Sequence, residues 1–179
     1  MKNFLLVSLF FAVVGLLATP ANAQERSNDS SRPSPNAMVS QTIGTTVVTI
    51  TYGRPSLRGR DMSGLAPSGR VWRTGANEST AITFSNDVMF GGQEVAAGTY
   101  SLYTIPGESE WTLIINEKLS WGTAYDEAMD VVRVPSAVVK NNAPMAESFT
   151  IFFDTLSDTK AHLNLHWGTT LVAVPITTE

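Results

Sequence analysis

The sequence predicts an all-β protein, an antiparallel β-sandwich for which a jelly roll is one candidate form. From residue 38 onward, the chain contains roughly ten short segments rich in β-branched and aromatic residues, and several of them alternate apolar with polar side chains. Clusters of Gly, Pro, Asn and Asp separate these segments at intervals of about eight to twelve residues, as in sandwiches and barrels. No segment has the apolar period of a long helix, and no repeat of fixed length is visible.

The first strands are expected to form tight hairpins. Gly44 marks the turn between the first two, and the pair Gly91 and Gly92 supplies the positive backbone angles of another. Ile82 and Phe84 alternate with polar residues, so one face of their strand should be buried. In chain order, strands are expected at residues 38–43, 47–52, 80–85, 88–90, 93–95, 99–105, 111–115, 131–134, 137–140, 148–155, 161–167 and 171–176.

Residues 99–105 and 111–115 are the clearest strands and are expected at the centre of a sheet. A Pro-Gly turn joins them, and Trp111, Leu113 and Ile115 share one face by the two-residue period. These three side chains are therefore predicted to lie in the core. Residues 118–128 follow neither period and are interpreted as a loop, with a turn of helix around 125–129.

The chain divides into a leader, a tether and one domain. Lys2, an apolar run over residues 4–17 and a small-residue cleavage pattern at 21–23 are typical of a secretory signal peptide over residues 1–23. Residues 24–36 contain no large apolar side chain and are predicted to be a disordered tether. Residues 37–179 are expected to form a single β-sandwich domain.

Composition limits the location and the partners of this domain. The chain has no Cys, which favours export to a bacterial periplasm or exterior over a eukaryotic secretory route. The net charge is −4, and loss of Lys2 with the leader leaves eleven basic residues against sixteen acidic ones. An acidic protein is a poor general partner for nucleic acid or an anionic membrane. The apolar run is shorter than the roughly twenty residues of a membrane span, and the oligomeric state stays open.

The most distinctive stretch is the Gly- and Pro-rich segment 54–77, interpreted as a long structured loop. Arginine presents a fixed fork of donors that suits carboxylate, phosphate or sulfate, so this loop can bind an anionic ligand. Alternatively, each arginine pairs with an acid such as Glu78 or Asp130 and braces the loop. The candidate ligand-binding residues of this loop are Arg54, Arg58, Arg60, Arg70, Arg73 and Asn77.

The second loop adds Trp121, Tyr125 and Asp126 as candidate ligand-binding residues. Aromatic faces beside a carboxylate can stack on a sugar ring and accept its hydroxyl hydrogens, although the two aromatic residues can equally cover one end of the sandwich. Together with Glu127 and Asp130, Asp126 also permits the alternative of a glycan hydrolase that uses loop carboxylates.

No catalytic residue, metal ligand or cofactor is assigned. There is no thiol nucleophile and no Gly-x-Ser-x-Gly motif. His162 and His166 alternate with apolar residues on a strand, which sets them about 13 Å apart and disfavours a shared metal ion. Their polar row is interpreted as a solvent-facing side of that strand.

Four strings resemble a family of exported bacterial proteins, the domain of unknown function 2911. They are RPSLRGR at 54–60, GRVWRTGAN at 69–77, AGTYSLYTIP at 97–106, and the strand that runs from Trp111 to Asn116. The resemblance covers residues 38–176 and implies an exported β-rich protein without an assigned activity, cofactor or catalytic residue. We therefore expect a non-enzymatic exported sandwich that binds a small anionic or sugar-like ligand, or a partner protein, through the 54–77 loop. The alternatives are the glycan hydrolase and a purely structural envelope protein.

Overall fold

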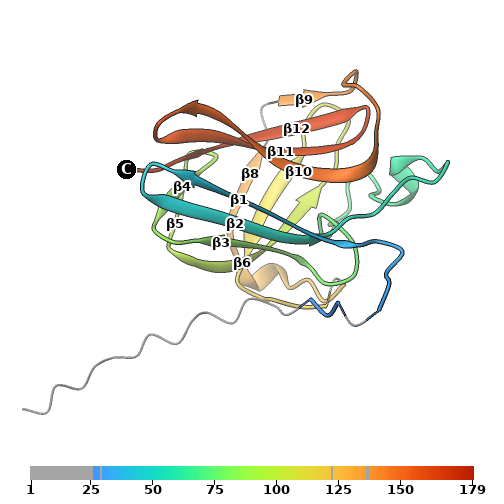
Figure 1. Ribbon diagram of the computed structural model, residues 1–179, viewed down its shortest axis with the longest axis horizontal. Helices are drawn as coiled ribbons and strands as arrows, with labels where there is room; N and C mark the ends of the chain where they lie inside the picture. The colour runs from blue at the N-terminus through green and yellow to red at the C-terminus, as the bar shows by residue number, and fades with distance from the viewer. Residues whose placement is uncertain (1–25, 29, 122, 136–137) are drawn as a thin grey trace, which may run out of the picture.

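The computed structural model describes residues 26–28, 30–121, 123–135 and 138–179, with the backbone alone for 138–140. The predicted leader, residues 24, 25 and 29 of the predicted tether, residue 122 of the second loop, residue 136, and residue 137 of the strand expected at 137–140 lie outside the described residues. Two antiparallel sheets face each other, so the predicted β-sandwich is confirmed (Figure 1). None of the helices in this described part is long and apolar enough to cross a membrane.

The first sheet is a six-stranded meander with one interruption. Its order is β1-β2-β3-β6-β7-β8, and the hairpin expected at the centre of a sheet, β6 and β7, has a neighbour on both sides. The strands are β1 (Asn36–Ile43), β2 (Thr46–Gly53), β3 (Thr80–Phe84), β6 (Gly98–Ile105), β7 (Thr112–Asn116) and β8 (Asp130–Pro135).

The second sheet has the order β10-β11-β12-β4-β5, with β9 also paired to β12. Two short 3-10 turns, η1 (Met62–Gly64) and η2 (Glu127–Met129), lie in the two long loops, and η2 occupies the predicted turn of helix. The strands are β4 (Val88–Phe90), β5 (Gln93–Val95), β9 (Val138–Lys140), β10 (Ala146–Ser157), β11 (Lys160–Gly168) and β12 (Thr170–Thr177).

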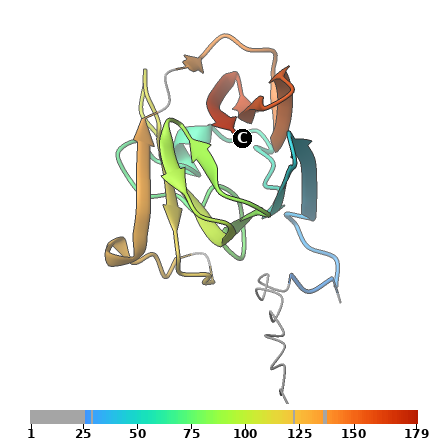
Figure 2. The same ribbon diagram turned by 90° about the vertical axis from the view of Figure 1, so that its left-hand side faces the viewer.

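The strand order identifies the type of sandwich. Most neighbouring strands are also consecutive in the chain, and only the β4–β5 hairpin leaves the first meander to extend the second sheet. This meander order takes the place of the jelly-roll order, which needs two Greek keys. In the view of Figure 2, the first sheet curves from β1 on one side to β8 on the other, with the C-terminal strands above it.

The sheets also meet at both of their edges. Gln41 Nε2 on β1 donates to Thr155 Oγ1 on β10 at 3.0 Å, and Gln93 Nε2 on β5 donates to the carbonyl oxygen of Arg133 on β8 at 2.9 Å. These contacts join the two sheets along both sides of the sandwich. The loops lie at its two ends.

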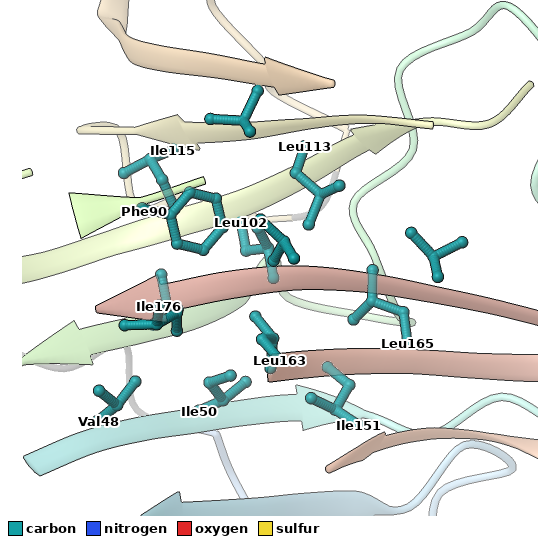
Figure 3. Close-up of a cluster of buried hydrophobic side chains, with 14 of the residues drawn as sticks. Val48, Ile50, Phe90, Leu102, Leu113, Ile115, Ile151, Leu163, Leu165 and Ile176 are labelled. Carbon is teal, nitrogen blue, oxygen red and sulfur yellow. The ribbon is translucent and has the colours of Figure 1, made fainter. Parts of the chain in front are cut away.

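The core fills the space between the sheets with inward-facing side chains from both (Figure 3). Ile50 on β2 and Leu163 on β11 are fully buried. Trp111, Leu113 and Ile115 are buried too, so the predicted core face of this hairpin is confirmed. Among the described residues, every core residue lies at or beyond residue 37, so residues 26–28 and 30–35 add no side chain to the core.

The two ends of the sandwich differ. At the end where β2 finishes at Gly53, here called the loop end, residues 54–79 connect β2 to β3. The opposite end, here called the hairpin end, carries the β1–β2 turn at Gly44, whose N–H donates to the carbonyl oxygen of Asp158 at 2.7 Å. Six of the nine candidate ligand-binding residues, those from Arg54 to Asn77, lie in the 54–79 loop.

Candidate functional site

The 54–79 loop joins the two sheets across the loop end. Its first part pairs with the second sheet, because Leu57 N–H donates to the carbonyl oxygen of Glu147 at 3.0 Å and Ser56 bridges Ser148. Its later part pairs with the first sheet, where Trp72 and Thr104 exchange backbone hydrogen bonds of 2.7 and 2.9 Å. The length of the loop is therefore explained by the distance between its two attachment strands.

Trp72 fixes the loop to the core. Its indole is buried and stacks on Trp167 with ring centroids 5.5 Å apart, while Trp111 and Phe149 contact it edge-on at 6.3 and 5.0 Å. The sequence interpretation missed this anchor, because Trp72 stands inside an Arg-rich string rather than in a periodic strand. An isolated large apolar residue between turn residues is the signal that could have identified it.

Two of the five arginines brace the loop against backbone carbonyl groups. Arg54 Nε donates to the carbonyl oxygen of Phe149 at 3.0 Å, and its Nη2 donates to Thr150 Oγ1 at 2.8 Å. Arg60 donates to the carbonyl oxygens of Leu57 and Ser56 at 2.9 and 3.1 Å. These charged donors hydrogen-bond to carbonyl oxygens of the loop and of β10 and so hold the irregular backbone in place.

The other three arginines are less engaged. Arg58 is exposed and its Nη2 donates to the carbonyl oxygen of Pro33 at 2.9 Å. Arg70 is also exposed, and within the described residues its side chain forms no ion pair. Arg73 is half-buried, and its Nε is buried without a hydrogen-bond partner.

None of the five loop arginines pairs with an acid in the part of the chain that the structure describes. The alternative in which they pair with Glu78 or Asp130 is therefore wrong for those two acids, which have other partners. Asp130 accepts from Tyr125 and Arg133 at 2.6 and 2.7 Å. Glu78 pairs with arginines from the segment before β1.

The carboxylate of Glu78 is buried and holds two guanidinium groups. Arg32 Nη1 lies 2.9 and 2.8 Å from its two oxygens, and Arg26 Nη1 lies 3.3 Å from Oε2. Burial opposes the charged carboxylate, yet hydrogen bonds from its own N–H and from Arg32, with the charges of Arg26 and Arg32, hold the pKa of Glu78 below its usual value. Burial beside these groups lowers the pKa of Arg26 to about 10, so both partners are charged at neutral pH.

These contacts bear on the predicted tether. Residues 26–28 and 30–35 form no helix or strand, in keeping with their composition, yet the side chains of Arg26 and Arg32 lie against the domain. Asn77, a candidate ligand-binding residue at φ 66°, donates from Nδ2 to the carbonyl oxygen of Ser34 at 3.2 Å. Asn tolerates this left-handed conformation better than most residues, and here its side-chain amide donates a hydrogen bond to the segment before β1.

The second loop, residues 118–128, also contacts Glu78 and its neighbour Ser79. Glu78 and Trp121 form an antiparallel bridge, and Ser79 N–H donates to the carbonyl oxygen of Ser120 at 3.1 Å. The Trp121 side chain is 63% exposed. The structure thus brings Asn77 and Trp121 to neighbouring positions around Glu78, while Arg54 contacts β10 of the other sheet and Arg60 contacts its own loop.

Tyr125 and Asp126 are occupied by contacts within their own loop. The Tyr125 ring packs on Tyr103 with centroids 5.0 Å apart, and its hydroxyl lies between Asp130 and Arg133. Burial first, and then the hydrogen bond to Asp130, raises the pKa of Tyr125 to about 12. Asp126 Oδ1 accepts from Ala128 N–H and caps η2. The Asp126 side chain is 47% exposed and lies 3.8 Å from Lys118 Nζ, so Trp121, at 63%, is the more exposed of these two candidates.

The remaining candidates for chemistry have structural partners. Glu127 pairs with Arg133 at 2.9 Å, and Asp130 is held by Asn116 as well as by Tyr125. His162 and His166 lie on β11 as predicted, and no group of three or more His, Cys, Asp or Glu side chains among the described residues could hold a metal ion. Between them, Asn164 is buried at 4% exposure, so this row is not wholly a solvent face.

A hollow of about 540 Å³ lies at the hairpin end. Hydroxyl and carboxyl groups line much of it, and none of the nine predicted ligand-binding residues does. Its lining includes Thr46, Asn86, Asp87, Glu94, Thr178 and Glu179. It is therefore separate from the loop end, where the predicted residues lie.

With this geometry in place, the comparisons with known proteins can be stated. A family model described as "Protein of unknown function (DUF2911)" matches residues 34–176, which is most of the chain. The chain belongs to this DUF2911 family. No curated protein and no protein of solved structure matches the chain. The resemblance seen in the sequence is thereby confirmed, and the matched range begins just before β1, where the sandwich begins.

Proposed function

We propose that this DUF2911 protein is an exported, non-catalytic β-sandwich that binds an anionic ligand through the outer side of its 54–77 loop. The observation that carries the proposal is the unbalanced charge of the loop. Among the described residues, none of its five guanidinium groups has a carboxylate partner, although the chain as a whole has a net charge of −4. Exposed, unpaired arginines create a local positive potential and can grip carboxylate, phosphate or sulfate groups with two donors at once.

The arrangement favours an extended anionic ligand over an enclosed small one. Arg58 and Arg70 are exposed on the loop, so they can contact several anionic groups in turn along a surface. Trp121 adds an exposed aromatic face at the same end of the molecule. Export is part of this proposal and rests on the leader pattern; protein recovered outside the cytoplasm should have an intact mass that begins at Gln24.

The structural alternative also has support, because Arg54 and Arg60 clearly brace the loop. The binding and bracing roles can be separated by comparing Arg70→Gln with Arg54→Gln. Arg70→Gln should change the free energy of unfolding by less than about 0.5 kcal/mol, as surface substitutions usually do. Arg54→Gln should cost about 1.5–3 kcal/mol, since it removes two hydrogen bonds from a charged donor.

Ligand binding itself is tested by thermal unfolding with phosphate or sulfate against chloride at matched ionic strength. A ligand that binds only the folded state stabilises it by about 2.7 kcal/mol at a hundredfold excess over its Kd. The stabilisation should exceed the chloride control and disappear in the double variant Arg58→Gln/Arg70→Gln. Lys160→Gln, which removes an exposed cation at the hairpin end, is the matched control and should keep it. Equal shifts in phosphate, sulfate and chloride would refute the anion site.

A further inference from the structure

The acceptor groups around Glu78 form a site with the chemistry of an arginine receptor. The carboxylate is 5% exposed, and beside it the carbonyl oxygens of Glu78 and Ser79 accept from Arg26 Nη2 at 3.2 and 2.6 Å. A carboxylate with two carbonyl groups matches the planar, many-donor guanidinium better than it matches a compact ammonium group. We call these acceptors, from Glu78 and Ser79, the arginine cradle.

The cradle belongs to the domain and not to the segment that fills it. Glu78 and Ser79 directly precede β3, and both are held by the second loop through the Glu78–Trp121 bridge and the Ser79–Ser120 hydrogen bond. With Arg26 and Arg32 in place, the Glu78 side chain is 5% exposed. A buried carboxylate without a cationic partner is costly, so this position requires a cation.

The filling segment is attached in a way that allows it to leave. Residues 26–28 and 30–35, here called the strap, contribute no residue to the hydrophobic core and no strand to either sheet. Beyond Arg26 and Arg32, the strap is held at Ser27 and Asn28, whose carbonyl oxygen and Oδ1 accept from Asn36 Nδ2 at 3.1 and 2.7 Å, and at its Pro33 to Pro35 end. There its carbonyl oxygens accept from Arg54 N–H at 2.8 Å, from Arg58 Nη2 at 2.9 Å and from Asn77 Nδ2 at 3.2 Å.

The polar character of these attachments decides how the strap behaves. Salt bridges and hydrogen bonds exchange with water and with competing groups of the same chemistry, whereas a buried apolar strand does not separate without unfolding. Pro33 and Pro35 restrict the backbone of this end of the strap, which bends at residues 33 and 34. The Nε of Arg26 is buried and has no hydrogen-bond partner. The strap therefore buries one donor without satisfying it, and a competing segment could bind without this loss.

We propose that the arginine cradle is a binding site for an extended protein segment that carries two arginines with a proline directly after the second, and that the strap is its tethered occupant. A partner protein with such a segment displaces the strap and takes its place on Glu78. The cradle uses the Glu78 carboxylate, whereas the anion site uses the loop arginines; Arg58 takes part in both, because its Nη2 also donates to the carbonyl oxygen of Pro33 in the strap. The lowered pKa of Glu78 is consistent with a carboxylate that stays ionised for this role.

The direct test supplies the segment as a separate peptide. The receptor is the chain from Gln24 with Arg26→Gln and Arg32→Gln, in which the strap can no longer fill the cradle. The probe is a synthetic peptide with the sequence of residues 24–36, and its binding is measured by calorimetry. We expect saturable binding to the double variant and at least tenfold weaker binding to the chain with its native strap, which competes.

Matched variants identify the groups responsible. Adding Glu78→Gln to the receptor should weaken peptide binding at least tenfold, and so should replacing both peptide arginines by Gln. A peptide with both arginines replaced by Lys should also bind more weakly, because an ammonium group cannot reproduce the planar fork. A folded double variant that binds no peptide at millimolar concentration, or that binds it equally well after Glu78→Gln, would overturn the proposal.

A second measurement needs no substitution of the strap arginines. The chain has no Cys, so Ser30→Cys places a single fluorescent label on an exposed position of the strap. Unlabelled peptide should displace the strap and lower the anisotropy of the label, while the Gln-substituted peptide should leave it unchanged. If the anisotropy does not respond to the native peptide, the strap is not exchangeable and the proposal fails.

Discussion

Trp72 shows how one residue can tie a long loop to a core. Its ring contacts Trp111, Phe149 and Trp167 around a shared position between the sheets, and its backbone pairs with β6. Aromatic pairs of this geometry add about 0.5–1.5 kcal/mol each beyond the burial of their surface. The position of the 54–79 loop therefore depends on core packing as well as on the hydrogen bonds of Arg54 and Arg60.

Replacement of Trp111 tests this packing at the scale of a residue. Trp111→Ala empties a site that is 2% exposed and removes a contact with Trp72, so it should cost about 3–5 kcal/mol in the free energy of unfolding. Trp121→Ala is the matched control, because Trp121 is 63% exposed and should cost less than about 0.5 kcal/mol. Urea unfolding of both variants measures the difference; similar losses would contradict the burial of Trp111.

At the scale of elements, the sequence predicted the strands well and their pairing poorly. Alternation in segments such as 99–105 and 111–115 reflects one buried face, a local property that can be read along the chain. Membership of a sheet depends on contacts between distant segments. The β4–β5 hairpin was foreseen from its glycine pair, but its place beside β12 in the second sheet was not, because nothing local distinguishes the two sheets.

The β4–β5 turn allows a sharp test at this scale. Gly91 and Gly92 both have positive φ, 58° and 86°, so Ala at either position should cost about 1–2 kcal/mol in backbone strain. A Cβ at Gly91 would also collide with Val134 on β8, whereas one at Gly92 would meet open space. Gly91→Ala should therefore lose about 1–3 kcal/mol more than Gly92→Ala, the usual cost of overpacking. Equal losses in thermal unfolding would show that the hairpin does not pack on β8.

At the scale of the whole molecule, the charges are arranged by contacts that span the chain. Glu78 meets Arg26 and Arg32, 52 and 46 residues away in sequence, while the five arginines of its own loop find other partners or none. Composition and turn residues identified the Arg-rich loop, whereas the sequence left open whether Trp121 contacts a ligand or covers one end of the sandwich. It could not assign Glu78 to its arginines, because ion pairing over such separations is decided by the folded arrangement of three segments.

This long-range ion pair makes the stability of the molecule depend on acid pH in a defined way. The pKa of Glu78 is lower in the folded protein than the ordinary value of 4.5, so the folded state binds protons less readily than the unfolded one. The stability that this carboxylate contributes is fully present above about pH 4.5, and it is lost as the pH falls from there through the folded pKa.

Urea unfolding at a series of pH values, for the native chain and for Glu78→Gln, measures this contribution. Other carboxylates are present in both proteins, so the difference between the two free energies of unfolding isolates Glu78. The difference should be constant from pH 7 to about pH 5 and should shrink as the pH drops below about 4.5. Glu94→Gln, which removes an exposed carboxylate at the hairpin end, controls for the loss of one negative charge. A difference that stays constant down to pH 2.5 would mean that protonation of Glu78 costs the folded state nothing, and that Arg26 and Arg32 do not hold its charge in solution.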